Sequence, residues 1–128
     1  PDNKEVEPFK YSKVATATWM SRRQVETCVQ GTMSLFSHCL GNGENVALVL
    51  RDIGVLLIEG KKVQVKFYYS FLEMLAGKEN LEKVIFEVPW LLDTVMSRVE
   101  PVASLTFSGR VIIFPTFEME IVPKVLPR

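Results

Sequence analysis

The sequence predicts a mixed α+β domain, in which an amphipathic helix packs on a three-stranded antiparallel sheet and is followed by helices and a C-terminal β-hairpin. Two observations lead to this fold class. A capped stretch over residues 21–40 carries apolar side chains at helical spacing. Three short runs rich in β-branched residues then follow within residues 45–67, separated by turn formers. A chain of 128 residues with 48% hydrophobic residues is long enough to bury a core.

The amphipathic helix is expected over residues 21–40. Its opening residues, SRRQ, fit a capping box, in which Ser21 accepts a hydrogen bond from a first-turn amide and Gln24 reaches back. The apolar residues that follow occupy an arc of roughly 160° at 100° per residue, wider than the ~100° stripe of an ordinary surface helix. They are Val25, Cys28, Val29, Met33, Leu35, Phe36, Cys39 and Leu40. The helix therefore needs more than one contact surface, and Met33 and Leu35 lie at the two flanks of the arc.

The sheet is expected to be an antiparallel meander. Its strands are predicted at Asn45–Leu50, Val55–Glu59 and Val63–Phe67. Only a glycine-containing turn at Gly60–Lys62 joins the second strand to the third, so we expect a tight reversal with no projecting arm. Alternation in the third strand puts Val63, Val65 and Phe67 toward the core. With Val46, Leu48, Val55 and Leu57, they would cover one part of the helix.

The remaining chain is predicted to hold short helices and a hairpin. The helices are expected at Ser70–Leu75, Asn80–Val88 and Pro89–Val99. A hairpin is expected over Ala103–Phe114 around Ser108–Gly109. The alternating run after it is a further candidate strand, and its flanking prolines confine it to a sheet edge.

Three segments follow from this pattern. Residues 1–20 are interpreted as a linker and N-terminal segment, and within it residues 10–20 fit a short strand and an irregular helix equally. Residues 21–100 are the main domain, and residues 101–128 are a C-terminal hairpin extension. Because the chain begins at Pro1 rather than Met, we expect it to be a piece of a longer protein.

Composition and motifs argue against catalysis. The one histidine, His38, lies opposite the apolar arc and has no nucleophile beside it on the helix. The sequence has no cluster with metal-ligand spacing and no phosphate-binding glycine loop before a helix. We therefore expect no enzymatic activity and no cofactor. No apolar run approaches the ~18 residues that a membrane span requires, so no membrane partner is expected.

The two cysteines are expected to be reduced. Cys28 and Cys39 are eleven residues apart on one helix, hence roughly 16 Å apart along its axis. A disulfide needs Cα atoms within about 7 Å, so these two cannot bridge each other. We expect both to be buried on the helix face that meets the sheet, where they act as small hydrophobic residues. Reduced thiols are typical of an intracellular protein.

A family resemblance sharpens the fold prediction. The order of a capped helix, a glycine turn, the run NVALVLRDIGVLLIEGKKVQVKF and a further helix resembles the HU/IHF fold of bacterial histone-like proteins. A more specific resemblance, to the second HU-like domain of the coiled-coil domain-containing protein 81 family, is carried by VETCVQGTMSLFSHCL, DIGVLLIEGKKVQVKFYYSFLEMLAG and NLEKVI. It implies a longer protein with two tandem HU-like domains and a following coiled coil. It also implies a cytoplasmic location at centrosomes, cilia and the cytoskeleton, without enzymatic activity.

Two functions are consistent with that resemblance. The first is a non-enzymatic protein-interaction or assembly module. The alternative is a nucleic-acid-binding HU-like domain, for which Lys61, Lys62 and Lys66 are the candidate weak anion contacts. Bacterial HU grips DNA with a long basic β-ribbon arm that ends in a proline wedge. That arm has no counterpart here, and 15 basic residues are balanced by 15 acidic ones, so nucleic acid is the less favoured partner.

Candidate interface residues lie on the helix and at the end of the third strand. They are Met33, Leu35, Tyr68, Arg22 and Arg23. Tyr68 faces away from Phe67, and the two arginines offer charge to an acidic partner. We expect the flanks of the helix to be covered by another HU-like domain, either from the same chain or from a second copy. The competing cover is the segment 101–128 folded back, and the expected wider partners are centrosomal or ciliary proteins.

Overall fold

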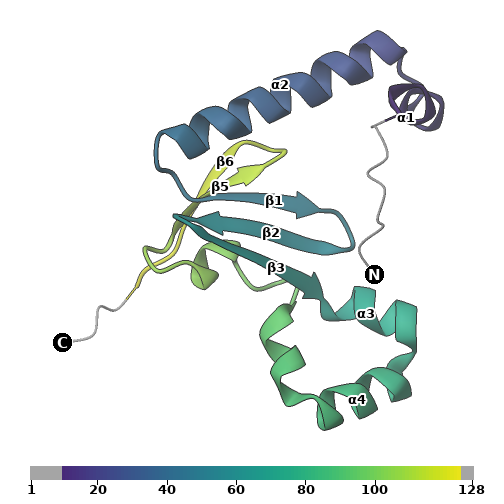
Figure 1. Cartoon of the computed structure of the whole chain (residues 1–128), viewed down its shortest axis with the longest axis vertical. Helices are drawn as coiled ribbons and strands as arrows, with labels where there is room; N and C mark the ends of the chain where they lie inside the picture. The colour runs from purple at the N-terminus through teal and green to yellow at the C-terminus, as the bar shows by residue number, and fades with distance from the viewer. Residues whose placement is uncertain (1–9, 125–128) are drawn as a thin grey trace. The chain divides into compact units, whose positions relative to one another are not determined.

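The computed structural model describes residues 10–124 (Figure 1). In chain order its elements are α1 (Tyr11–Thr18), α2 (Arg22–Gly41), β1 (Val46–Leu50), β2 (Gly54–Glu59), β3 (Lys62–Tyr68), α3 (Tyr69–Ala76), α4 (Lys78–Glu87), the 3-10 helix η1 (Pro89–Thr94), β4 (Val95–Met96), the 3-10 helix η2 (Val102–Leu105), β5 (Arg110–Phe114) and β6 (Glu118–Ile121). The fold is therefore α+β, as predicted. The chain forms two compact units, residues 1–35 and residues 36–128, which divide within α2.

The first unit contains α1 and most of α2. The segment whose sequence fits strand and helix equally is helical, and it ends at Trp19, whose backbone is left-handed with φ 60°. The predicted capping box is confirmed at the start of α2. Ser21 donates its backbone N–H to Gln24 Oε1 at 2.9 Å, and Gln24 donates its backbone N–H to Ser21 Oγ at 3.1 Å. Two otherwise unpaired backbone amides are thereby satisfied.

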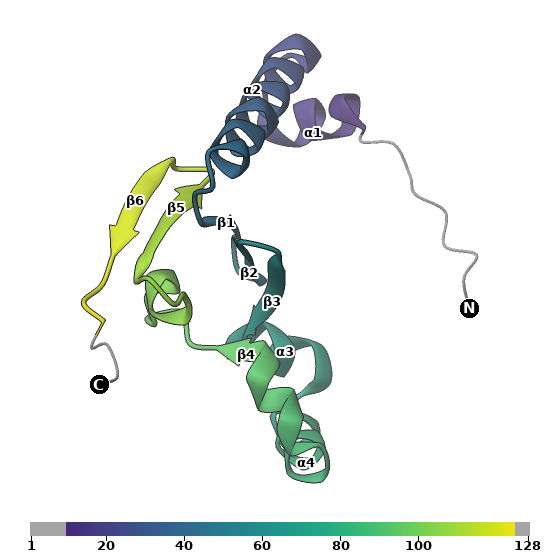
Figure 2. The same ribbon diagram turned by 60° about the vertical axis from the view of Figure 1, so that its left-hand side comes forward.

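The second unit is built on one mixed sheet, and here the predicted three-stranded sheet needs correction. Strands β1, β2 and β3 do form the expected antiparallel meander. Three further strands extend it to six, in the order β4-β3-β2-β1-β5-β6, which Figure 2 shows along the sheet. Strand β5 pairs in parallel with β1, and β4 pairs in parallel with β3. The later chain thus completes both open edges of the meander.

The turn between β2 and β3 is as tight as predicted. Glu59 pairs with Lys62 in the sheet register, so only Gly60 and Lys61 form the reversal. Gly60 has a φ of 59°, a left-handed conformation that glycine adopts without steric penalty. No β-ribbon arm projects from this turn.

Two predictions for the C-terminal half are wrong in detail. The stretch expected to be helical over residues 89–99 is a 3-10 helix that ends at Thr94, after which β4 pairs alongside the end of β3. The hairpin expected around Ser108–Gly109 is instead formed by β5 and β6. Residues 103–105, expected to lie in the first arm of that hairpin, belong instead to the 3-10 helix η2. In both places a strand partner distant in sequence outweighed the local pattern.

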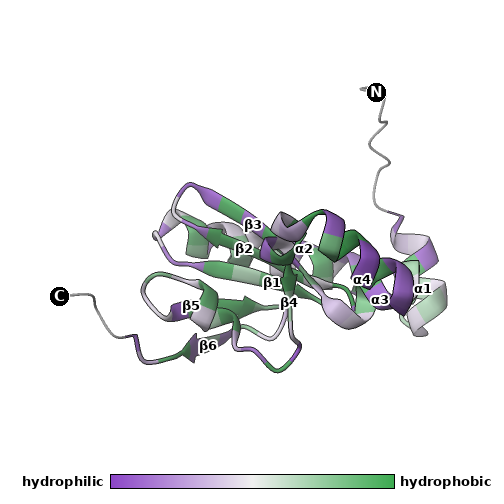
Figure 3. Ribbon diagram, turned by 90° about the horizontal axis from the view of Figure 1, so that it is seen from below, coloured by the Kyte–Doolittle hydropathy of each residue, from purple (hydrophilic) through white to green (hydrophobic). Residues whose placement is uncertain are grey.

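The core of the second unit lies between the sheet and η2. Strand residues Ala47, Val55, Leu57 and Val111 are buried there with Val102 and Ala103 of η2. Figure 3 shows apolar residues running along the central strands, with hydrophilic residues at turns and on α4. The sheet and η2 together form the frame on which the candidate surface lies.

Candidate functional site

Side-chain alternation divides the sheet into two faces. Residues that pair directly across strands point to the same face. The face that we name the closed face carries Ala47, Val49, Val55, Leu57, Tyr68, Val111 and Ile113. It is covered by η2 and by Met96 of β4. Glu120 of β6 holds η2 against the sheet, because its carboxylate accepts a hydrogen bond from the Ala103 backbone N–H at 2.8 Å.

The opposite side of the sheet is also apolar, and we name it the open face. Its members by register are Val46, Leu48, Leu50, Leu56, Ile58, Val63, Val65, Phe67, Ile112, Phe114, Met119 and Ile121. The one charged residue that the register places with them is Arg110, which pairs with Ile121. Val95 of β4 pairs with Phe67 and joins the same face, so all six strands contribute to this surface and it extends across the whole sheet.

Only one end of the open face is covered within the second unit. The ring of Phe36, from the last turns of α2, lies against the ring of Phe114 with centroids 5.1 Å apart. The ring of Phe117 also lies near the ring of Phe114, with centroids 5.7 Å apart. Toward β3 and β6 the cover ends, because Val63 is 62% exposed, Val65 47% and Ile121 63%. Exposed apolar patches of this extent mark interaction surfaces in soluble proteins.

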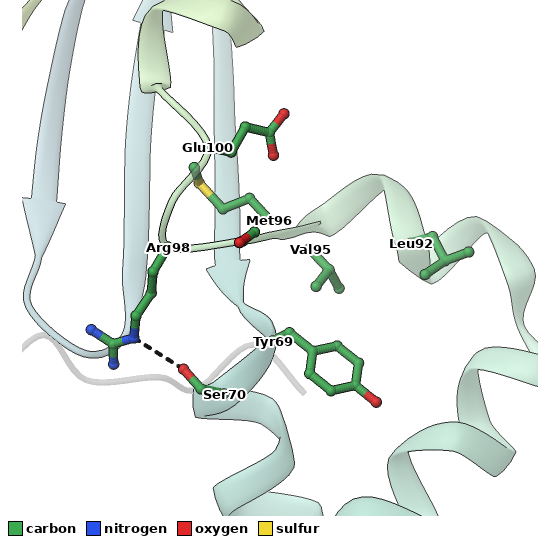
Figure 4. Close-up of a pocket in the computed structure, with 8 residues that line it drawn as sticks. Tyr69, Ser70, Leu92, Val95, Met96, Arg98 and Glu100 are labelled. Carbon is green, nitrogen blue, oxygen red and sulfur yellow. Dashed lines mark hydrogen bonds between the residues drawn. The ribbon is translucent and has the colours of Figure 1, made fainter.

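A hollow lies at the junction of β3, α3 and β4. It has a volume of about 490 Å³ and is lined by Tyr69, Ser70, Leu92, Val95, Met96, Ser97, Arg98 and Glu100 (Figure 4). The Arg98 guanidinium is already engaged on three sides. It donates to Ser70 Oγ at 3.1 Å, pairs with Asp52 at 2.9 Å and lies 4.9 Å from the centroid of the Tyr68 ring.

This arrangement makes Arg98 a connector between segments. It ties the chain after β4 to the β1–β2 turn and to the start of α3. Among residues 10–124, no group of three or more metal-ligating side chains comes together. The His38 ring lies 3.2 Å from the side-chain amide of Asn42, the residue just after α2. None of these contacts provides a nucleophile with an adjacent base.

The element order also matches a known family. The model of CCDC81 eukaryotic HU domain 2 matches residues 5–79, which take in α1, α2, the meander and α3. The chain belongs to the CCDC81 eukaryotic HU domain 2 family. No solved structure matches it. Within residues 10–124, no helix is long and apolar enough to cross a membrane.

The match to the CCDC81 HU family model ends at residue 79, just after α3, but three strands of the sheet come later in the chain. Strands β4, β5 and β6 and the helix η2 all follow residue 79. The HU-like part therefore supplies the meander, and the chain beyond the match supplies both outer edges and the cover of the closed face. The open face combines side chains of both parts, as Val65 and Ile121 illustrate.

The predicted interface residues have different environments in this CCDC81 HU domain. Arg22, Arg23 and Met33 are exposed, and Leu35 is partly buried, all in the first unit. Tyr68 is a correction. It points away from Phe67 as expected, but that direction is the closed face, where it is only 7% exposed. Its side chain packs in the core and is not available to a partner.

The three candidate anion-contact lysines do not form one site. Lys61 and Lys62 are exposed at the β2–β3 turn, where Lys62 pairs across the sheet with Glu59. The Lys66 ammonium donates a hydrogen bond to the Asp93 carbonyl oxygen. Lys66 therefore connects β3 to η1, which leaves two exposed lysines beside an acidic residue.

Sequence reasoning missed most of the open face. Val63 and Val65 were expected to face the core, but they lie on the exposed side of β3. Val46 and Leu48 lie on the open face, whereas Val55 and Leu57 lie on the closed face, so these four do not form one surface. One signal was available. Strands β1 and β2 are apolar at both odd and even positions, which is typical of a sheet that is buried on both sides, whereas β3 alternates.

Proposed function

We propose that this chain is a non-enzymatic protein-interaction and assembly module, and that it assembles through the open face. The observation that carries the proposal is that the apolar side chains of Val63, Val65 and Ile121 are exposed on the open face. A sheet that is apolar on both faces is normally covered on both. One cover is η2, and a partner protein would supply the other.

The partner that fits best is another HU-like domain, either from the same longer protein or from a second copy of this chain. A surface that is apolar except for Arg110 favours a partner with a matching apolar surface rather than a polyanion. We further propose, from the family resemblance, that the assembly is cytoplasmic and associated with the centrosome, cilium or cytoskeleton. The wider partners would then be centrosomal or ciliary proteins.

A nucleic-acid role has weaker support. The tight turn at Gly60 and Lys61 has no projecting arm, and the formal net charge is +0 at pH 7. Binding to phosphates depends on basic side chains and falls steeply with salt. Binding of a fluorescent DNA duplex more tightly than micromolar at physiological salt would overturn the preference for a protein partner.

The open face is tested by analytical ultracentrifugation of the chain, alone and mixed with the HU-like domain that would precede it in the full-length protein. Val63→Glu and Val65→Glu place a carboxylate on the exposed part of the face. Val99→Glu is the matched control, because Val99 is 89% exposed outside the strands. We expect association of the parent chain, a weakening of roughly tenfold or more (about 1.4 kcal/mol) in the first two variants, and no change in the control.

Two outcomes would overturn the assembly proposal. One is a parent chain that stays monomeric both alone and in the mixture. The other is association that Val63→Glu and Val99→Glu weaken equally, because that would place the contact elsewhere. Circular dichroism spectra of all variants establish that the glutamates have not unfolded the sheet.

A further inference from the structure

We infer that the corner between α1 and α2 is a second docking surface, and that it takes an acidic peptide segment of a partner protein with an apolar side chain as anchor. The inference rests on the proposed role in protein interaction, but it uses the first unit and no residue of the open face. Figure 1 shows the chain turning from α1 into α2. By sequence, Trp19, Met20, Arg22 and Arg23 lie at this corner.

The conformation and exposure of Trp19 are the first observation. The residue ends α1 with a φ of 60°, a left-handed conformation that is sterically unfavourable for any residue with a Cβ. Glycine is the residue that helix ends prefer there. The side chain is also 98% exposed, so it contributes almost nothing to packing in its own unit. Helix termination and packing therefore give no reason for a tryptophan here, whereas binding does, because tryptophan is enriched among residues that dominate interfaces.

A hollow beside the tryptophan is the second observation. It has a volume of about 400 Å³ and is lined by Met20, Ser21, Arg23, Gln24, Thr27 and Cys28. Met20 and Cys28 give it apolar walls, and the Arg23 side chain stands at its edge. A space of this size accepts one apolar side chain of a partner, and the guanidinium can then bind a neighbouring carboxylate in a two-pronged contact.

Charge selects the kind of partner. Residues 10–35 contain four cations, Lys10, Lys13, Arg22 and Arg23, and one carboxylate, Glu26. Within the described chain neither arginine forms an ion pair. Both stand in the first turn of α2, where positive charge opposes the helix dipole. The capping box already satisfies the backbone of this turn, so an anion here is bound by the arginine side chains.

A peptide selection tests the chemistry of the partner directly. A random displayed peptide library is selected on the parent chain, and the recovered peptides are then measured by fluorescence in a Trp90→Phe background, so that the signal reports Trp19. We expect recovered peptides rich in Asp and Glu around an apolar residue. Trp19→Ala and the double variant Arg22→Glu with Arg23→Glu should each weaken their binding tenfold or more. Lys61→Glu with Lys78→Glu is the matched charge-reversal control and should leave it unchanged, as should Val63→Glu.

Several results would overturn the inference. Recovered peptides that are neutral or basic, an empty selection, or peptides that bind Trp19→Ala as well as the parent would each contradict it. A single-stranded oligonucleotide that competes more strongly than the acidic peptides would make the corner a nucleic-acid surface instead. Slow acrylamide quenching of Trp19 in the free chain would mean that the protein covers this surface itself. Loss of assembly in Val63→Glu with peptide binding intact would separate this surface from the open face.

Discussion

The side-chain amide of Asn45 donates a hydrogen bond to the backbone carbonyl oxygen of Arg110 at 2.9 Å, across 65 positions of the sequence. The same nitrogen lies 3.1 Å from Ser108 Oγ. Beside Asn45, at the end of β2, the Glu59 carboxylate accepts a hydrogen bond from the Phe107 backbone N–H at 2.7 Å. These polar contacts join the HU-like part to the strand that lies beyond it, and they hold β5 in register beside β1.

Substitution of Asn45 by alanine should loosen this junction. The change removes the donor to Arg110 and Ser108, and a net loss of about 1–2 kcal/mol in unfolding free energy is expected for hydrogen bonds of this kind. Urea unfolding followed by circular dichroism measures it. Asn42→Ala is the matched control, because the Asn42 side chain makes a local contact to the His38 ring, four residues earlier in the chain, at 3.2 Å. Equal midpoints for the two variants would show that the Asn45 bridge adds no stability.

Phe114 should be among the residues most sensitive to truncation. It is 1% exposed, and its ring packs against the rings of both Phe36 and Phe117. Phe114→Ala is expected to lower the unfolding free energy by about 3–5 kcal/mol, as cavity formation does for buried phenylalanine. Phe107→Ala serves as the control, since Phe107 is 78% exposed. Comparable thermal midpoints for the two variants would contradict the placement of Phe114 in the core.

Local pattern predicted the parts of this fold that local interactions decide. The capping box at Ser21, the meander and the turn at Gly60 all follow from neighbours close in sequence. The two parallel pairings do not, because β1 meets β5 and β3 meets β4 only through long connections. Parallel partners carry no turn signal between them. The six-stranded sheet was therefore outside the reach of this reasoning.

The candidate surface, too, was predicted correctly only where local sequence decides the outcome. Alternation correctly separates Tyr68 from Phe67, but it does not say which face a domain covers. The answer depends on η2, whose Ala103 packs in the core on the side of Tyr68. The sequence around Ala103 predicts a strand and gives no sign that η2 covers the side of Tyr68. The side of Val63 and Val65 was therefore taken for the core instead. The arginines of α2 are placed correctly, because their exposure depends only on the helical wheel.

The two thiols should react at different rates. Cys39 is 4% exposed, whereas Cys28 is exposed, which corrects the expectation that both are buried. The buried side of α2 in the first unit is centred on Val25, and Cys28 lies about 60° around the helix from it. A bulky thiol reagent on the native chain should label one thiol quickly and the second only on unfolding. Cys28→Ser should remove the fast phase, and a fast phase that persists in this variant would contradict the assignment.

Two glycines should respond to alanine in opposite directions. At Gly54 a Cβ atom would lie 2.1 Å from the Lys66 carbonyl oxygen and 2.9 Å from the Phe67 Cα, both backbone atoms of the paired strand. Neither can move without separating β2 from β3, so Gly54→Ala should cost about 3 kcal/mol or more.

Gly31, by contrast, lies inside α2, where an added methyl group would meet no neighbouring side chain within 4 Å and the backbone has no positive φ. Gly31→Ala should therefore stabilise the helix by about 0.5–1 kcal/mol, because alanine loses less backbone entropy. Urea unfolding followed at the helical circular dichroism band compares both variants with the parent. A destabilised Gly31→Ala would mean that this face of α2 is tightly packed against a partner, and a neutral Gly54→Ala would contradict the close approach of β2 and β3.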